Sequence, residues 1–242
     1  MQIPHPIEAV IFDLDGTLVQ TEAVHCSAWL QVLAQRGFHY DEKWFEQWIG
    51  TADRFLAQGV IDEHQLSIPP RTLQKEKEAL FHQLVVKKNQ AFSGIEAGLQ
   101  RLHAHVPLAI ATNSAERDTF FVFQSTPINK YMQAVLTADH VEKLKPAPEM
   151  YLLAAQRLGV RPEGCLVMED SPAGSEAAQK AGMYMIGLTS SQPKEKMTAV
   201  HEWWDQPQDG MKRIINLVEQ VNQHAWVALS TIRFLDWPLV MP

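Results

Sequence analysis

The chain has 242 residues, of which 46% are hydrophobic and 20% are charged, and its formal net charge is −7. This composition is typical of a globular protein with a sizeable core, and the acidic balance disfavours a nucleic-acid backbone as the main partner. A small anionic substrate is still allowed, because a few local donors suffice to bind one.

Cysteine usage and the chain ends predict where the protein works. Cys26 and Cys165 lie far apart and lack the spacing of metal ligands, which favours a reducing compartment. The first six residues lack the basic and apolar regions of a secretion signal. The most apolar late stretch, residues 225–235, is interrupted by polar residues and is too short to span a bilayer. We therefore expect a cytoplasmic protein that does not bind a membrane.

The first predicted strand ends in two carboxylates. Residues 7–12 are mostly β-branched and aromatic, and Asp13, Asp15 and Gly16 follow them. In an extended chain residues two apart face the same way, so both carboxylates project from the strand tip. A hard cation would relieve their repulsion, and Mg²⁺ is expected because it needs few protein carboxylates when a phosphate supplies further oxygens. Gly16 permits a sharp turn beside a ligand, although a polar turn or a calcium-loop fragment also fits this motif alone.

About seventy residues of helical spacing follow this strand. The pattern predicts a first helix that ends at Gly37 and further helices near residues 41–48, 54–58 and 71–89. We read them as a helical bundle inserted between the first strand and the rest of a sheet. The expected domains are a discontinuous core of residues 1–18 and 93–222, a cap of residues 19–92, and a tail of residues 223–242 with no assigned role.

From residue 92 onward predicted strands alternate with helices. Strands are expected at residues 107–112, within 131–138, at 164–168 and at 183–188, and helices at 95–103, 115–124, 146–158 and 171–181. This alternation predicts an α/β, Rossmann-like core, with a parallel sheet covered by helices on both faces. Ligands of such sheets bind beyond the carboxyl ends of the strands.

Polar residues gather where these strands end. They are Thr112, Asn113 and Ser114 after one strand, Lys145 just ahead of the helix predicted to begin at Pro146, and Glu169 and Asp170 after a third strand. Each group alone has an ordinary explanation, such as a helix N-cap or a solvated charge. Together at one sheet edge they predict a phosphate site, since the helix after Ser114 can present its N–H groups to an anion.

With these motifs, residues 7–190 resemble the haloacid dehalogenase superfamily, in its branch of phosphatases and phosphomutases with a helical cap after the first strand. The resemblance implies that Asp13 is the nucleophile and that Asp15 is the general acid and base. An aspartyl-phosphate would divide the hydrolysis into two easier steps. Dehalogenases of this superfamily lack the acid matching Asp15 and the magnesium site, so that founding activity is not expected here.

The same resemblance implies roles for the other strand-end residues. Thr112 and the backbone of Asn113 would bind the phosphoryl oxygens, and Lys145 would neutralise their charge. The implied Mg²⁺ ligands are Asp13, Asp15 through its backbone carbonyl, and Asp170 with Glu169 beside it. These groups suit phosphoryl transfer, which depends on positioning and on neutralising oxygen charge.

Two residues of the predicted cap match pocket residues of the relatives. His25 would lie near the leaving group, and Trp29 would frame the pocket, although a buried structural role for His25 also fits its apolar helix. Mutases of the family hold a second phosphate with an arginine at the position of Asp53. Here Arg54 comes one residue later and would point about 100° away, which favours transfer to water. Four further cap lysines are expected on a solvated helix face: Lys75, Lys77, Lys87 and Lys88.

The sequence thus predicts a Mg²⁺-dependent phosphatase for a small phosphorylated metabolite, either a sugar phosphate or a phosphoglycolate-like compound, working as a monomer or homodimer. A β-phosphoglucomutase-like phosphomutase is the first alternative, and a non-catalytic regulatory or binding module is the second. The aromatic residues within 201–242 are expected to pack on the core or to form a dimer contact.

Overall fold

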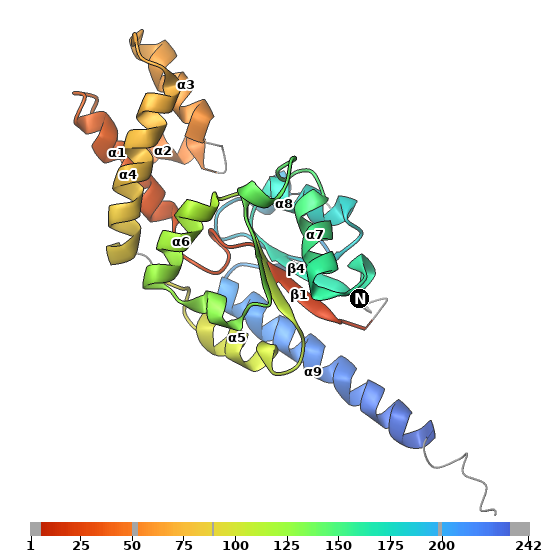
Figure 1. Ribbon diagram of the computed structural model, residues 1–242. Helices are drawn as coiled ribbons and strands as arrows, with labels where there is room; N and C mark the ends of the chain where they lie inside the picture. Colours follow the sequence, from red (N-terminus) through yellow and green to blue (C-terminus); the bar gives the residue numbers. More distant parts are fainter. Residues whose placement is uncertain (1–5, 50–52, 89, 198–199, 233–242) are drawn as a thin grey trace, which may run out of the picture.

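The computed structural model describes residues 6–49, 53–88, 90–197 and 200–232, with side chains up to residue 220. In this part of the chain six strands form one sheet in the order β3-β2-β1-β4-β5-β6 (Figure 1). Every pairing in it is parallel. The strands are β1 (Ala9–Phe12), β2 (Leu108–Ala111), β3 (Ala134–Leu136), β4 (Cys165–Glu169), β5 (Tyr184–Leu188) and β6 (Glu202–Trp204). The predicted α/β fold with a parallel sheet is confirmed.

Helices cover both faces of the sheet because successive strand residues point to opposite sides. In β1, Val10 and Phe12 belong to one buried cluster, whereas Ala9 and Ile11 belong to the other. The first cluster includes residues of α5 (Ile95–His103), α6 (Glu116–Ser125) and α9 (Pro207–Ile232), and the second includes residues of α7 (Glu149–Leu158) and α8 (Pro172–Lys180). Short 3-10 helices lie at Glu46–Trp48, Ile128–Tyr131, Ala138–His140, Pro162–Gly164 and Lys194–Lys196.

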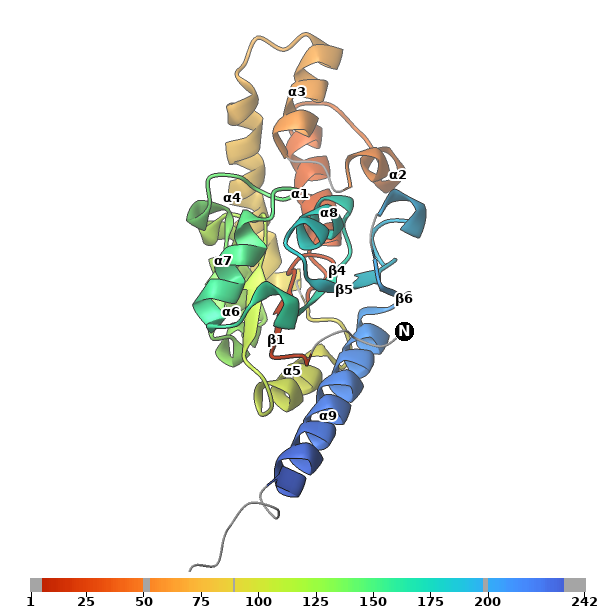
Figure 2. The same ribbon diagram turned by 90° about the vertical axis from the view of Figure 1, so that its right-hand side faces the viewer.

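The four helices that follow β1 stand together beyond one end of the sheet (Figures 1 and 2). They are α1 (Glu22–Ala34), α2 (Glu42–Phe45), α3 (Asp53–His64) and α4 (Pro70–Lys88). They pack around a buried cluster of their own, which includes Trp29 and Leu73. The chain leaves and re-enters the core at one place, where the N–H of Gln20 donates to the carbonyl of Gln90 at 2.9 Å. All four helices lie within residues 19–92, the segment for which a helical insertion is predicted.

Two helix boundaries differ from the predicted ones. Helix α7 begins at Glu149 rather than at Pro146, which follows a cis peptide bond from Lys145. Ala147 precedes Pro148, and a residue before proline is pushed out of the helical region. Helix α3 runs well past the predicted residues 54–58, because tertiary packing outweighs the low helix propensity of Gly59. A side chain at Gly59 would collide with the ring of Trp48.

The C-terminal part adds the sixth strand and a long helix that the sequence pattern did not predict. Trp203 and Trp204 of β6 are half-buried against the two core clusters, as expected for aromatics in this region. Helix α9 packs along α5, where Arg101 and Glu219 form an ion pair at 2.6 Å, and then continues past the core (Figure 2). The tail predicted at 223–242 includes residues 233–242, which lie outside the described part. None of the described helices is long and apolar enough to cross a membrane.

Candidate functional site

The carboxyl ends of β1, β2 and β4 bring the predicted site residues to one edge of the sheet. The N–H of Asp13 donates to the carbonyl of Met168 at 3.0 Å, which holds the tips of β1 and β4 side by side. Thr112 follows β2, and Asp170 follows β4. All three site residues are almost completely buried, with Asp13 at 7%, Thr112 at 1% and Asp170 at 3% exposure.

Lys145 joins two of the buried carboxylates. Its Nζ donates to Asp13 Oδ1 at 2.7 Å and to Glu169 Oε1 at 2.9 Å. The amide side chain of Asn113 fixes the lysine backbone, because Oδ1 accepts from the Lys145 N–H at 3.0 Å and Nδ2 donates to its carbonyl at 3.2 Å. Asn113 therefore positions Lys145, a task that the sequence did not indicate.

Negative charge exceeds positive charge among these buried groups. Burial raises the pKa of Asp13 well above its usual range, Lys145 only partly offsets this, and Glu169 and Asp170 raise it further. Burial and then Glu169 raise the pKa of Asp170 to about 7. For Lys145, burial alone would lower the pKa, but Asp13 and Glu169 raise it well above the ordinary lysine value. One ammonium thus faces more carboxylates than it can neutralise.

Three hydroxyl groups surround the carboxylate of Asp15. Oδ1 accepts from Thr21 Oγ1 at 2.5 Å, and Oδ2 accepts from Thr112 Oγ1 at 3.2 Å and from Ser114 Oγ at 2.6 Å. Thr21 begins the helical insertion, so this carboxylate contacts both parts of the chain. The side chain of Asp15 is fixed in direction and remains partly exposed.

Gly16 lies against the carboxylate of Asp170. The glycine has φ +77°, and a Cβ at this position would collide with Asp170 Oδ2 and with Ser191 Oγ. Thr17 Oγ1 donates to Asp170 Oδ1 at 3.1 Å, and Ser190 Oγ donates to the Gly16 carbonyl at 3.1 Å. The loop after β5 therefore also contributes to the site, and only glycine fits this turn.

We expect Gly16→Ala to remove activity for more than one reason. The substitution strains a left-handed backbone and also displaces the Asp170 carboxylate. Gly37→Ala is the matched control, because Gly37 has φ +85° and a methyl group added there would meet nothing within 4 Å. Kinetic assays and thermal melts of both variants should show similar backbone strain but loss of turnover only for Gly16→Ala. Equal activity of the two variants would contradict this role for Gly16.

Glu169 is engaged by protein groups on both carboxylate oxygens. Oε2 accepts from the N–H of Ser171 at 2.6 Å, while Oε1 accepts from Lys145 and, at 3.2 Å, from Ser171 Oγ. The carboxylate also lies against Gly174, where a Cβ would collide with it. Within the described residues, no group of three or more His, Cys, Asp or Glu side chains could hold a metal ion. Both oxygens of Glu169 thus accept hydrogen bonds from protein groups, and its predicted place at a metal stays a prediction.

The predicted cap residues form a hydrogen-bonded network with two further side chains. Lys77 Nζ lies 2.6 Å from His25 Nδ1 and 2.6 Å from Asp53 Oδ2, and the indole N–H of Trp29 donates to Asp53 Oδ1 at 2.8 Å. Burial lowers the pKa of His25 to about 4, with Lys77 as the second cause, so the ring is neutral near pH 7. His25 also stacks on Phe81, with ring centroids 4.2 Å apart.

One expectation for the cap is wrong. Lys77 is 1% exposed, so it does not lie on a solvated helix face, whereas Lys75, Lys87 and Lys88 are exposed as expected. Trp29 is fully buried and donates to Asp53, and its place beside a substrate pocket stays a prediction. The expected surface role of Lys77 fails because its partners His25 and Asp53 come from helices α1 and α3, which a single-helix pattern does not reveal.

Glu22 lies between the cap network and the sheet edge. Burial raises the pKa of its carboxyl to about 7, and the negative charges of Asp15 and Asp53 add to this, whereas Lys77 opposes it. The insertion thus presents acidic groups to the sheet edge. Arg54, in contrast, is exposed and lies over the ring of Phe55 at 4.8 Å from its centroid.

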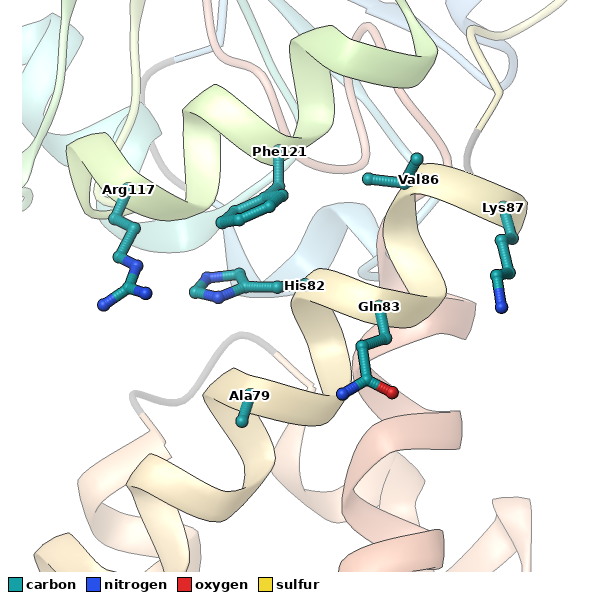
Figure 3. Close-up of a pocket in the computed structure, with 7 residues that line it drawn as sticks. All are labelled: Ala79, His82, Gln83, Val86, Lys87, Arg117 and Phe121. Atoms are coloured by element: carbon teal, nitrogen blue, oxygen red, sulfur yellow. The ribbon is translucent and has the colours of Figure 1, made fainter.

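A separate open hollow of about 450 Å³ lies between α4 and α6 (Figure 3). In it His82 stacks on Phe121 with centroids 4.2 Å apart, and His82 Nε2 lies 2.5 Å from Asp118 Oδ1. The ring pair and the hydrogen-bonding contact of His82 with Asp118 fasten α4 of the insertion to α6 of the core. None of the carboxylates at the sheet edge lines this hollow.

Two serines of the site follow the end of a predicted strand and could have been predicted from that position. Ser190 and Ser191 follow the predicted strand at 183–188, and the rule that strand ends carry the ligand site applies to them as well. Ser114 was noticed but given no role. Thr21, Lys77 and Asp53 carry no comparable signal, because their contacts depend on how the helices pack.

Comparisons with known proteins agree with this geometry. The family model of haloacid dehalogenase-like hydrolases matches residues 10–188. Fructose-1-phosphate phosphatase YqaB of Escherichia coli (strain K12) is 34% identical over 179 residues, covering 74% of this chain and 95% of that protein. The phosphorylated carbohydrates phosphatase of Thermotoga maritima is 32% identical over 185 residues, covering 74% of this chain and 84% of that protein.

Solved structures share the fold as well. The structure of CbbY from Rhodobacter sphaeroides in complex with phosphate is 25% identical, with a TM-score of 0.72, covering 85% of this chain and 99% of that chain. The matched residues 10–188 include the ends of β1, β2 and β4, whereas Ser190 and Ser191 follow the matched segment. On this evidence the chain belongs to the haloacid dehalogenase-like hydrolases.

Proposed function

We propose that this chain is a Mg²⁺-dependent phosphatase that removes the phosphoryl group of a small phosphorylated sugar through an aspartyl-phosphate. Its family and its phosphatase relatives make it a hydrolase of phosphate monoesters. The observation that carries the proposal is the sheet edge itself. There Asp13 accepts a hydrogen bond from Lys145. Asp15 follows two residues later in the chain, and three hydroxyl groups orient its carboxylate.

The side chains of this edge can divide the reaction into two steps, phosphoryl transfer to Asp13 and hydrolysis of the acyl phosphate. Asp13 Oδ1 is held by Lys145, so Oδ2 is the oxygen that attacks phosphorus and forms the acyl-phosphate bond while the ester P–O bond breaks. Asp15 gives its proton to the leaving oxygen and then takes a proton from the water that attacks the same phosphorus. Phosphate leaves, and the Asp13 carboxylate is regenerated.

The residues present fit a Mg²⁺ ion. The carboxyl pKa values of Asp13 and Asp170 are both raised, and Gly16 lets the Asp170 carboxylate approach the turn after β1, where a Cβ would collide with it. Mg²⁺ usually takes only one or two protein carboxylates and completes its shell with water and phosphate oxygens. We assign Asp13, Asp170 and the backbone carbonyl of Asp15 as ligands, with Glu169 orienting Lys145. The bound ion would neutralise charge on the phosphoryl oxygens.

Residues 19–92 act in this proposal as a cap over the sheet edge. The cap supplies Thr21 to Asp15 and places Glu22, His25 and Asp53 on the substrate side. Transfer to water rather than to a second sugar phosphate agrees with an aspartate at position 53. A positive group would be needed there to hold a second phosphate.

A phosphate-release screen tests the proposal. The purified chain is incubated with Mg²⁺ and a panel of sugar monophosphates, phosphoglycolate and nucleotides. We expect release from sugar monophosphates, its loss on chelation with EDTA, and its return when Mg²⁺ is added in excess. Formation of glucose 6-phosphate from β-glucose 1-phosphate with a bisphosphate primer, without free phosphate, would instead establish a phosphomutase. Absence of turnover on every compound would favour a non-catalytic module.

A further inference from the structure

One face of α1 leads from the sheet edge into the cap. Thr21, His25 and Trp29 are spaced four residues apart and therefore lie one above another on that face. Thr21 donates to Asp15 at its lower end, and Trp29 donates to Asp53 at its upper end. Four residues of helix rise about 6 Å, so the backbones of Thr21 and Trp29 lie about 12 Å apart along the axis. That span suits the carbon chain of a small phosphorylated polyol.

The carboxylate of Asp53 is fixed and keeps free acceptor capacity. Trp29 donates to Oδ1 at 2.8 Å, and Lys77 donates to Oδ2 at 2.6 Å. Each carboxylate oxygen has two lone pairs, and the side chain is 38% exposed, so both oxygens can accept further bonds. Asp53 shares Lys77 with His25, which lies one turn above Thr21 on α1, and Thr21 donates to Asp15. The carboxylate therefore lies on the face of the cap that leads to the phosphoryl site.

The positive charge of this network is not available to a ligand. Lys77 is 1% exposed and is enclosed by Asp53 and His25. His25 is neutral near pH 7, as its lowered pKa indicates. The charged group that a ligand meets on this wall is therefore the carboxylate of Asp53, which accepts hydrogen bonds and lies beside the neutral, partly exposed ring of His25.

We propose that Asp53 is a specificity-determining residue that binds hydroxyl groups of a neutral polyol part of the substrate and disfavours substrates with a second anionic group. The inference rests on the proposed phosphatase function and narrows it to neutral polyol monophosphates. A hydroxyl donates a charge-assisted hydrogen bond to a fixed carboxylate, whereas a carboxylate or second phosphate meets a like charge there. Phosphoglycolate is accordingly a poor substrate.

The test compares two inhibitors of nearly equal size. Glycerol 3-phosphate and 3-phosphoglycerate differ in a terminal hydroxymethyl or carboxylate group, and each competes with p-nitrophenyl phosphate hydrolysis in Mg²⁺. We expect the inhibition constant of 3-phosphoglycerate to be higher by about tenfold or more, since a mismatched polar group can cost that much in recognition. In Asp53→Asn the ratio should fall towards one. The ratio does not depend on how much of a preparation is folded.

Asp53→Asn leaves the buried ammonium of Lys77 without its carboxylate partner, so a second variant is needed as a check on folding. Asp53→Asn with Lys77→Met removes both charges, and the inhibition ratio should fall in it as well. Asp62→Asn is the control, because Asp62 is an exposed acid on the same helix α3. Equal inhibition of the unmodified chain by both compounds, or a ratio unchanged in both Asp53 variants, would overturn the inference. Absence of any hydrolysis would contradict the proposed function instead.

Discussion

Replacement of Asp13 by asparagine is expected to abolish phosphate release, by roughly 10⁴-fold or more as judged from the loss of other enzyme nucleophiles. An amide oxygen cannot form the covalent phosphoryl intermediate, and the variant also removes one proposed Mg²⁺ ligand. Single-turnover assays with the best sugar monophosphate from the screen measure the effect. Asp205→Asn is the matched control, because Asp205 is an exposed acid directly after β6. Retained turnover in Asp13→Asn would show that another group is the nucleophile.

The same variant should be more stable than the unmodified chain when no metal is bound. Burial first, and then neighbouring acids, raise the pKa of Asp13 in the folded state despite the attraction of Lys145. Because the folded pKa exceeds the unfolded one, stability falls as pH rises from the unfolded towards the folded value. Asparagine does not ionise, so Asp13→Asn does not lose this stability as the pH rises. We expect the variant to have the higher melting temperature in EDTA at pH 7, by about 2–4 °C for each kcal/mol of unfolding free energy gained. At acid pH the two proteins should differ little. A lower melting temperature at pH 7 would contradict the charge imbalance.

The parts of the fold that follow from local rules could be predicted. The strand at residues 7–12 and the later alternation of strands and helices depend on buried runs and helical spacing, which the sequence displays directly. A parallel sheet then brings its strand ends together, so the approach of Asp13 to Lys145 and Asp170 follows without coordinates. The site carboxylates were found for that reason.

What escaped prediction depends on contacts between distant segments. Helix α3 continues through Gly59 because the glycine allows the ring of Trp48 to pack closely, a contact with no local signature. Lys77 has the appearance of a surface lysine in its own helix, yet its burial requires Asp53 from a different helix. The bonds of Glu169 to Lys145 and Ser171 also could not be predicted from the residues around it. The position of the site could thus be predicted from the ends of the strands. Which charged side chains of the cap are buried or exposed depends on how its helices pack.

Replacement of Lys145 by methionine is expected to remove both stability and activity. The buried ammonium is the hydrogen-bond partner of Asp13 and Glu169, and removing one member of a buried ionic network typically costs about 3–5 kcal/mol. The pKa of Lys145 is raised in the folded state, so its contribution is present below the unfolded lysine pKa and is lost only as pH rises towards the higher folded value. Denaturant unfolding at pH 7 measures the loss, with the exposed Lys143→Met as control.

A second substitution separates the structural role of Lys145 from its catalytic role. The double variant Lys145→Met with Glu169→Gln also removes the carboxylate charge that the single variant leaves buried without its lysine. Much of the free energy of unfolding that Lys145→Met loses should therefore return. Turnover should stay about 10²–10³-fold low, because the donor to Asp13 and to the phosphoryl oxygens is still missing. Recovery of turnover along with stability would mean that Lys145 serves the fold alone. Recovery of neither would mean that Glu169 has a duty besides holding this lysine, such as a direct place beside the metal.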